Sequence, residues 1–189
     1  PYKTAGQLLD VTVLVPAWRN GKIIALFRPT IHHTDVGGHG IGAGGRDVLE
    51  EGLWIPICKL LKRGERNDDV WKFILSNVRQ PDHMAGDLHA QMASGEVGAQ
   101  RLNTLCAAHG LDDIEALADE IIDRSEEATR DSIRGLPSGT YKSSAVLDLA
   151  DGSKIDIVCA LTVDSDAGEI TVDYDGTSEA SPWGINVVM

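Results

Sequence analysis

The sequence predicts an α+β fold, with strands at both ends of the chain and helices between them. Three observations support it. The N-terminal part holds two apolar segments rich in β-branched residues around an Asn-Gly pair. The middle carries apolar residues at helical spacing, and the C-terminal part returns to short apolar runs separated by glycine turns. Because helices and strands are segregated rather than alternating, antiparallel strands are expected.

An N-terminal β-hairpin is predicted first. Its two strands cover residues 10–15 and 22–27, and an Asn-Gly pair joins them. This pair tolerates the positive φ angles of a tight turn. Since the turn folds the second strand back along the first, regular pairing would bring Asp10 close to residues 31–33.

A glycine-rich loop is predicted next, over residues 32–45, with six glycines in fourteen positions. Such a segment forms neither a stable helix nor a regular strand, and its backbone can approach a substrate or a phosphate closely. It lacks the spacing and the strand–helix setting of a dinucleotide-binding loop, and the chain has no GxxxxGK(S/T) sequence. The chain therefore carries no nucleotide-binding motif of its own.

Four helices are predicted in the middle of the chain, with Asn67 capping the second and Gly110 stopping the third. On the third, Asp87, His89 and Gln91 cannot all share a face, because alternate helical residues diverge by about 200°. The four helices cover residues 46–53, 68–78, 86–108 and 114–133. The apolar face of the second comprises Val70, Phe73, Ile74 and Val78.

Antiparallel strands close the prediction, and neither a repeat nor a low-complexity linker interrupts the chain. The predicted strands cover residues 140–149, 155–163 and 170–174. We divide the chain into a hairpin and loop segment with the candidate metal site (1–66), a helical segment (67–135) and a strand segment (136–189). All three are expected to be parts of one larger domain. The chain starts without a methionine, so we expect a fragment of a larger subunit.

The composition limits the partners. The net charge is −12, with 29 acidic and 17 basic residues, which disfavours nucleic acid because phosphate binding needs a basic surface. No apolar run approaches the roughly 20 residues of a membrane helix. Cys58, Cys106 and Cys159 are far apart and odd in number, which indicates neither a disulfide framework nor a zinc knuckle. These features favour a cytoplasmic protein that acts on small molecules.

Asp10, His32 and Asp35 are the strongest functional candidates. Asp10 begins one predicted strand, and the other two follow the strand paired with it. Imidazole and carboxylate together suit a divalent cation such as Mn²⁺, Zn²⁺ or Fe²⁺. Alternatively, Asp10 caps a turn and the histidines are surface loop residues. Spacing alone leaves both interpretations open.

Five segments, in order along the chain, carry a family resemblance. They are PYKTAGQLLDVTVLVP (1–16), HHTDVGG (32–38), EGLWIP (51–56), GDLHAQ (86–91) and DYDGT (173–177) followed by Asn186. These strings resemble blocks of the hydantoinase B/5-oxoprolinase family, which includes the large subunits of acetone and acetophenone carboxylases. The similarity spans essentially the whole chain, and family chains extend beyond it on both sides.

The resemblance implies ATP-dependent chemistry on a carbonyl or a cyclic amide. ATP would be bound by a hydantoinase A-like partner subunit in a hetero-oligomer. The sequence around the glycine-rich loop looks closer to the ketone carboxylase branch, so the expected function is carboxylation of the phosphorylated enol of a ketone. Two alternatives stay open. One is N-methylhydantoinase or 5-oxoprolinase-type amide hydrolysis, and the other is a non-catalytic structural subunit that has lost its metal.

The resemblance also places the metal ligands. They fall on Asp10 and His32, with Asp35 adjacent, and His32 and Asp35 become the catalytic candidates. The family's histidine three residues before Asp10 is Gln7 in this chain. A glutamine carbonyl is a weaker ligand for these ions than imidazole. Gln7 is therefore the fourth candidate ligand, and it makes metal identity and occupancy open questions.

Overall fold

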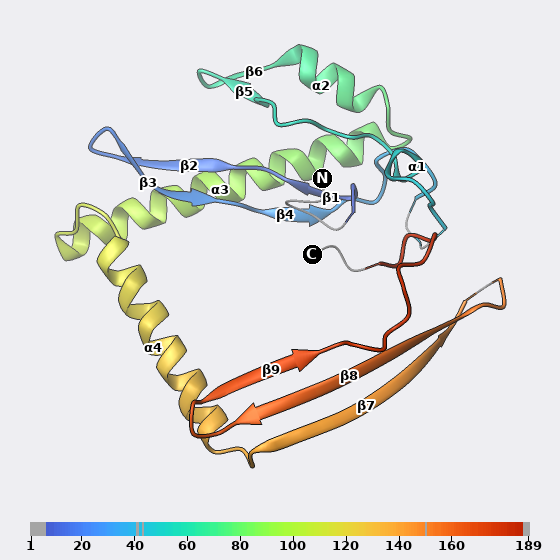
Figure 1. Ribbon diagram of the computed structural model, residues 1–189. Helices are drawn as coiled ribbons and strands as arrows, with labels where there is room; N and C mark the ends of the chain where they lie inside the picture. Colours follow the sequence, from blue (N-terminus) through green and yellow to red (C-terminus); the bar gives the residue numbers. More distant parts are fainter. Residues whose placement is uncertain (1–6, 41, 43, 150, 187–189) are drawn as a thin grey trace. The chain divides into compact units, whose positions relative to one another are not determined.

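The computed structural model describes residues 7–40, 42, 44–149 and 151–186. The chain divides into two compact units. One comprises Pro1–Asp113 with Ser181–Met189, and the other comprises Ile114–Ala180. Short strands come first along the chain, helices follow, and an antiparallel sheet comes last (Figure 1). The predicted α+β class is confirmed. The boundary between the units falls inside the helical segment predicted for residues 67–135.

The N-terminal hairpin forms as predicted, although its strands are divided. β2 (Val15–Arg19) pairs antiparallel with β3 (Lys22–Phe27), and β1 (Asp10–Thr12) pairs antiparallel with β4 (Thr30–His32). The strand predicted over residues 10–15 is therefore split between β1 and β2. The register places Asp10 opposite His32, within the predicted range of 31–33.

Positive φ angles close the hairpins of this unit. Asn20 and Gly21 have φ of 49° and 78°, as a two-residue turn with mirror-image geometry requires. A second hairpin, which was not predicted from the sequence, joins β5 (Leu61–Lys62) to β6 (Glu65–Arg66). Its strands have two residues each, which is too short for an alternating pattern to be recognised.

The described part of this unit contains three helices: α1 (Val48–Glu51), α2 (Asp68–Leu75) and α3 (Pro81–His109). α3 begins before the predicted Gly86, because Pro81 fits the first helical turn, where no backbone N–H is needed. It ends at Gly110, whose φ of 66° provides the left-handed cap. None of the helices within residues 7–40, 42, 44–149 and 151–186 is both long and apolar enough to cross a membrane.

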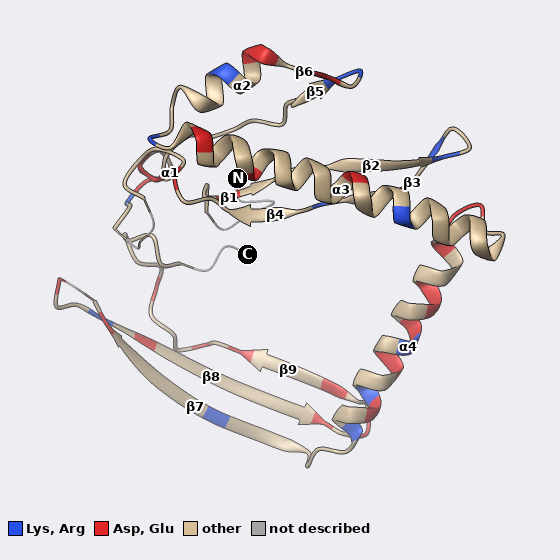
Figure 2. Cartoon of the chain, turned by 180° about the vertical axis from the view of Figure 1, so that it is seen from behind, with Lys and Arg blue, Asp and Glu red and all other residues tan. Residues whose placement is uncertain are grey.

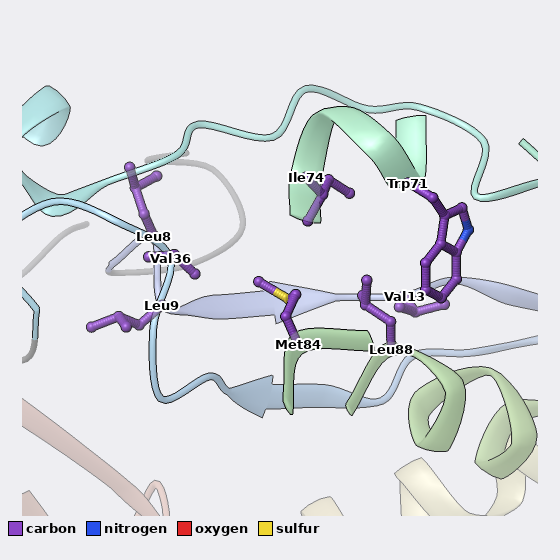
Figure 3. Packing of buried hydrophobic residues seen from close by; sticks show 8 residues of the cluster. All are labelled: Leu8, Leu9, Val13, Val36, Trp71, Ile74, Met84 and Leu88. Atoms are coloured by element: carbon purple, nitrogen blue, oxygen red, sulfur yellow. The ribbon is translucent and has the colours of Figure 1, made fainter. Parts of the chain in front are cut away.

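The described core of the first unit is a cluster drawn from the N-terminal turn and strand region, the glycine-rich loop, α2 and α3 (Figure 3). Phe73 was predicted to face the core but is 55% exposed, and Trp71 is the buried aromatic residue of α2 instead. Trp71 is buried with its indole N–H donating to the Leu60 carbonyl at 3.2 Å. The cluster comprises Leu8, Leu9, Val13, Val36, Trp71, Ile74, Met84 and Leu88.

The second unit packs one helix on a three-stranded sheet. α4 (Glu115–Arg134) contacts β8 (Lys154–Asp164) and β9 (Glu169–Asp173), and β7 (Gly139–Asp148) forms the far edge in the order β7-β8-β9. The predicted strands are confirmed to within one residue at their ends. Every residue of β7 is exposed, so the unit presents a long edge strand.

Helix α4 carries charge along its length (Figure 2). Arg124 pairs with Glu120, and Arg130 with Glu126, each one helical turn apart. No residue of this fully described helix is buried, and Ile121 and Ile122 are 56% and 62% exposed. These apolar side chains of α4 are therefore largely exposed.

Candidate functional site

The turn Gln7-Leu8-Leu9-Asp10 builds one side of the candidate site. Leu8 and Leu9 are only 9% and 3% exposed and belong to the core. The Leu8 N–H donates to the Glu51 carboxylate at 2.9 Å, and the Asp10 N–H reaches the Gln7 carbonyl at 3.4 Å. The two leucines therefore anchor the turn, and the polar residues that flank them are held beside the β1–β4 ladder.

His32 builds the other side. It lies opposite Asp10 in the ladder, and directly opposed residues project from the same face of the pair. The Nδ1 atom of His32 is 3.3 Å from an Asp10 carboxylate oxygen and 3.0 Å from the Gln7 amide nitrogen. The structure thus brings together three of the four predicted ligands.

The role of His32 Nδ1 depends on the tautomer of the ring. When the proton lies on Nε2, Nδ1 accepts from the Gln7 amide N–H; an Nδ1–H would instead donate to the Asp10 carboxylate. In the first arrangement the Nδ1 lone pair is also available to a cation. The His32 side chain is 43% exposed, so solvent reaches the ring.

The donor set fits a divalent cation. With metal–nitrogen and metal–oxygen distances of about 2.1 Å and tetrahedral angles, two ligand atoms lie about 3.4 Å apart. The 3.3 Å between His32 Nδ1 and Asp10 Oδ1 matches that edge. A half-turn of the Gln7 amide would exchange its N–H for a carbonyl oxygen as the third donor. Among the described residues, no three His, Cys, Asp or Glu side chains gather to hold a metal ion, so a cation here would need the glutamine as its third protein donor.

Asp35 is held elsewhere, although the sequence placed it with the metal ligands and, with His32, among the catalytic candidates. Its carboxylate accepts hydrogen bonds from the backbone N–H groups of Gly37, Arg79 and Gln80 and from the Arg79 guanidinium. Burial raises the pKa of Asp35, but these hydrogen bonds outweigh it, and the pKa lies below its ordinary value. Asp35 therefore ties the glycine-rich loop to the start of α3.

The residues behind the ladder were not identified as a group from the sequence. His33 is 1% exposed, its Nε2 lies 3.3 Å from the Gln91 side-chain oxygen, and its Nδ1 lies 3.5 Å from Asp87. Burial lowers the pKa of His33, which the Gln91 hydrogen bond and the Asp87 charge only partly offset. Asp87 and Gln91 share a helix face at a spacing of four residues, and this spacing was the available signal. His89 points to another side of the helix, as predicted, and its ring packs against Trp71 with the ring centroids 4.8 Å apart.

The glycine-rich loop divides into a packed part and an open part. A Cβ on Gly38 would lie 2.4 Å from the Glu50 carbonyl oxygen, and one on Gly37 would lie 2.9 Å from the Asn77 carbonyl oxygen. These two glycines thus allow backbone segments to touch. Gly40 and Gly44 have no heavy atom within 4 Å of a Cβ position. Only the open part retains room for the predicted approach to a ligand.

Comparison with known proteins identifies the family. The family model for hydantoinase B/oxoprolinase matches residues 1–189, the full length of the chain. The chain belongs to this family. The family resemblance predicted from the five sequence blocks is therefore confirmed.

Individual relatives of this hydantoinase B/oxoprolinase chain differ in their reactions. A protein of Pseudomonas sp. (strain NS671) named as the B subunit of a D-/L-hydantoinase is 34% identical over 186 residues, which cover 94% of this chain and 31% of the relative. The acetophenone carboxylase delta subunit of Aromatoleum aromaticum is 28% identical over 185 residues, covering 94% of this chain and 27% of the relative. The chain thus spans about a third of the length of these relatives.

A solved structure supports the fold of the hydantoinase B/oxoprolinase chain. The crystal structure of the ATP-dependent caprolactamase from Pseudomonas jessenii superimposes with a TM-score of 0.78 at 29% identity, covering 88% of this chain and 29% of the caprolactamase chain. The α+β arrangement described above is therefore part of a larger fold in that enzyme.

Proposed function

We propose that this chain carries the metal site of the large subunit of an ATP-dependent enzyme that acts on a cyclic amide or a ketone. The observation that carries the proposal is the convergence of Gln7, Asp10 and His32 across the β1–β4 ladder. Membership of the hydantoinase B/oxoprolinase family supports it, and so do relatives named as subunits of hydantoinase and carboxylase enzymes.

Asp10 and His32 would hold Mn²⁺, Zn²⁺ or Fe²⁺, with Gln7 as the third donor. Such an ion, when bound, acts as a Lewis acid toward a carbonyl oxygen. Asp10 would supply the negative charge of the site, and the Nδ1 atom of His32, 3.3 Å from the carboxylate, would supply a nitrogen ligand. The exposed edge of His32 leaves a side from which a substrate can approach.

We place cyclic amides first as the substrate class. The hydantoinase relative is 34% identical to this chain, whereas the acetophenone carboxylase relative is 28% identical. Ketone carboxylation, the function expected from the sequence around the glycine-rich loop, is the second candidate, and the carboxylase relative supports it. In both cases ATP would be bound by a hydantoinase A-like partner subunit, which matches the absence of a nucleotide-binding motif from this sequence.

Metal binding by the purified protein tests the proposed site. His32→Ala should abolish binding of Mn²⁺ or Zn²⁺ in calorimetric titration, whereas Gln7→His should tighten it, because imidazole is the better donor. His39→Ala is the matched control, since His39 is an exposed loop histidine. Equal metal binding by wild type and His32→Ala would refute the site. Absence of metal binding by the wild-type protein itself would favour the remaining alternative, a structural subunit that has lost its metal.

The substrate class needs the assembled enzyme. With the ATP-binding partner present, ATP-dependent ring opening of hydantoins or lactams would support the first candidate. ATP-dependent fixation of bicarbonate onto a ketone would support the second. Activity that survives His32→Ala in either assay would show that the chemistry lies outside the proposed site.

A further inference from the structure

We propose that Gln91 is a positioning residue for this metal site, and that it sets the distance between Asp10 and His32 through the backbone of the two strands. The inference rests on the proposed function, because it assumes that Asp10 and His32 bind the metal. Gln91 touches neither of them. It lies on α3, behind the ladder that carries both.

The first support is the way in which Gln91 is held. Its side chain is fully buried, at 0% exposure. The amide nitrogen donates to the carbonyl oxygens of Val11 at 2.8 Å and Pro29 at 3.1 Å. Both N–H groups are therefore used, and the amide oxygen is left to accept from Nε2 of His33 at 3.3 Å. The three contacts leave the amide one orientation.

The second support is where these contacts fall. Val11 directly follows Asp10 in β1, and His33 directly follows His32 at the end of β4. Successive residues of a strand point to opposite faces. The His33 side chain therefore points away from His32, and its ring meets Gln91 on α3. On β1 the contact is with the backbone carbonyl of Val11, one residue after Asp10. One side chain is thus bonded to both sides of the ladder, one residue away from each ligand.

The third support is that the ladder alone is weak. β1 and β4 form a two-stranded sheet with three paired positions, and an isolated ladder of this size is marginal in water. α3, by contrast, is a 29-residue helix packed into the core. Functional sites need their ligands held within about 0.5 Å. Gln91 transfers the rigidity of α3 to the ladder.

The test uses the purified protein and two variants. Gln91→Met keeps the length of the side chain and removes all three hydrogen bonds, while Gln91→Asn keeps the amide and withdraws it from the strands. The control is Ile74→Ala, which opens a cavity in the same core on α2 and so reproduces a general loss of stability. Mn²⁺ affinity is measured for each folded variant, and the visible spectrum of bound Co²⁺ reports the geometry of the ligands.

We expect Gln91→Met to weaken Mn²⁺ binding by about 10- to 100-fold, the range found when groups that orient metal ligands are removed. The Co²⁺ spectrum should change with it. Ile74→Ala should bind within about twofold of wild type and leave the spectrum unchanged. If Gln91→Met does not fold, Gln91→Asn is judged by the same criteria.

The possible failures are distinguishable. If Gln91 variants bind Mn²⁺ as wild type does, or lose no more than Ile74→Ala loses, the positioning role is wrong while the metal site stands. If the His32→Ala variant binds Mn²⁺ as tightly as the wild-type protein does, the proposed function itself fails.

Discussion

Asp35→Asn tests whether this carboxylate fastens the loop to α3 or serves the metal. The substitution preserves shape but replaces one oxygen with an NH₂ group. An Asn oxygen in the place of Oδ1 still accepts from the Gly37 N–H and from the Arg79 guanidinium. The other oxygen, Oδ2, accepts from the backbone N–H groups of Arg79 and Gln80. In the variant the Asn NH₂ group takes the place of Oδ2, so the two backbone N–H groups lose their acceptor and face another donor.

The expected cost follows from these contacts. A hydrogen bond to a charged group contributes about 1.5–3 kcal/mol, and two are lost at a residue that is 8% exposed. Water reaches part of this helix start, so we expect Asp35→Asn to lower the free energy of unfolding by about 3 kcal/mol. Arg79→Gln is the matched control. The Arg79 side chain is 64% exposed although Asp35 is 8% exposed. Water can therefore take the place of the guanidinium, and we expect Arg79→Gln to cost about 1 kcal/mol.

Urea denaturation of the purified protein, followed by circular dichroism, measures both changes. The structural role is refuted if Asp35→Asn costs less than about 1 kcal/mol, or if Arg79→Gln costs as much as Asp35→Asn. Metal binding gives a second readout. A structural Asp35 leaves Mn²⁺ affinity within about twofold of wild type, whereas loss of binding at unchanged stability would restore Asp35 as a ligand.

Three further predictions concern stability and association. Gly38→Ala should cost about 3 kcal/mol or more, because the new Cβ would lie 2.4 Å from a backbone oxygen at a φ of 56°. Gly40→Ala, with open space around it, should cost only about 1–2 kcal/mol for its positive φ; equal losses in urea denaturation would contradict this. The exposed edge strand β7 should favour self-association of the purified protein, and Val146→Lys should reduce it in sedimentation velocity; a wild-type monomer, or unchanged association of the variant, would contradict this. Because the pKa of Asp35 is lowered in the folded state, its contribution to stability should be lost as the pH falls below the ordinary value of 3.8. Asp35→Asn should flatten that part of the pH profile, and the idea fails if it does not.

The elements that the sequence predicted correctly are those that local chemistry determines. The hairpin turn depends on Asn20 and Gly21, two residues that tolerate positive φ wherever the remaining chain lies. Gly110 likewise ends α3 through its own backbone conformation. Regular pairing counted outward from the turn puts Asp10 opposite Ile31, within the predicted range of 31–33, and the register shift at Ala17/Trp18 moves it opposite His32. The proximity of the two strand ends was therefore predictable, whereas the residue that faces Asp10 depends on an irregularity that the turn does not reveal.

Contacts between distant segments were not predictable in the same way. The partner of Asp35 lies 44 residues away at Arg79, and no pattern in one sequence pairs a loop carboxylate with that arginine. Phe73 was placed in the core because its helical phase suits an apolar face. Trp71 is buried instead, and its indole N–H donates to the Leu60 carbonyl. Packing and hydrogen bonding together determine which aromatic side chain of α2 is buried, and the helical period of the sequence reports only on packing.

The doublet His32-His33 shows how two identical neighbours acquire different chemistry. Strand geometry sends their side chains to opposite faces, so His32 is 43% exposed beside Asp10, while His33 is 1% exposed behind the ladder. Burial lowers the pKa of His33 and favours its neutral form. Gln91, saturated on its nitrogen by two carbonyls, requires that the proton of this neutral ring lie on Nε2. The buried histidine thus joins the end of β4 to α3, whereas its neighbour lies exposed beside Asp10 and Gln7. In the proposed metal site, the exposed imidazole would bind the cation, and the buried one would fix the backbone that carries it.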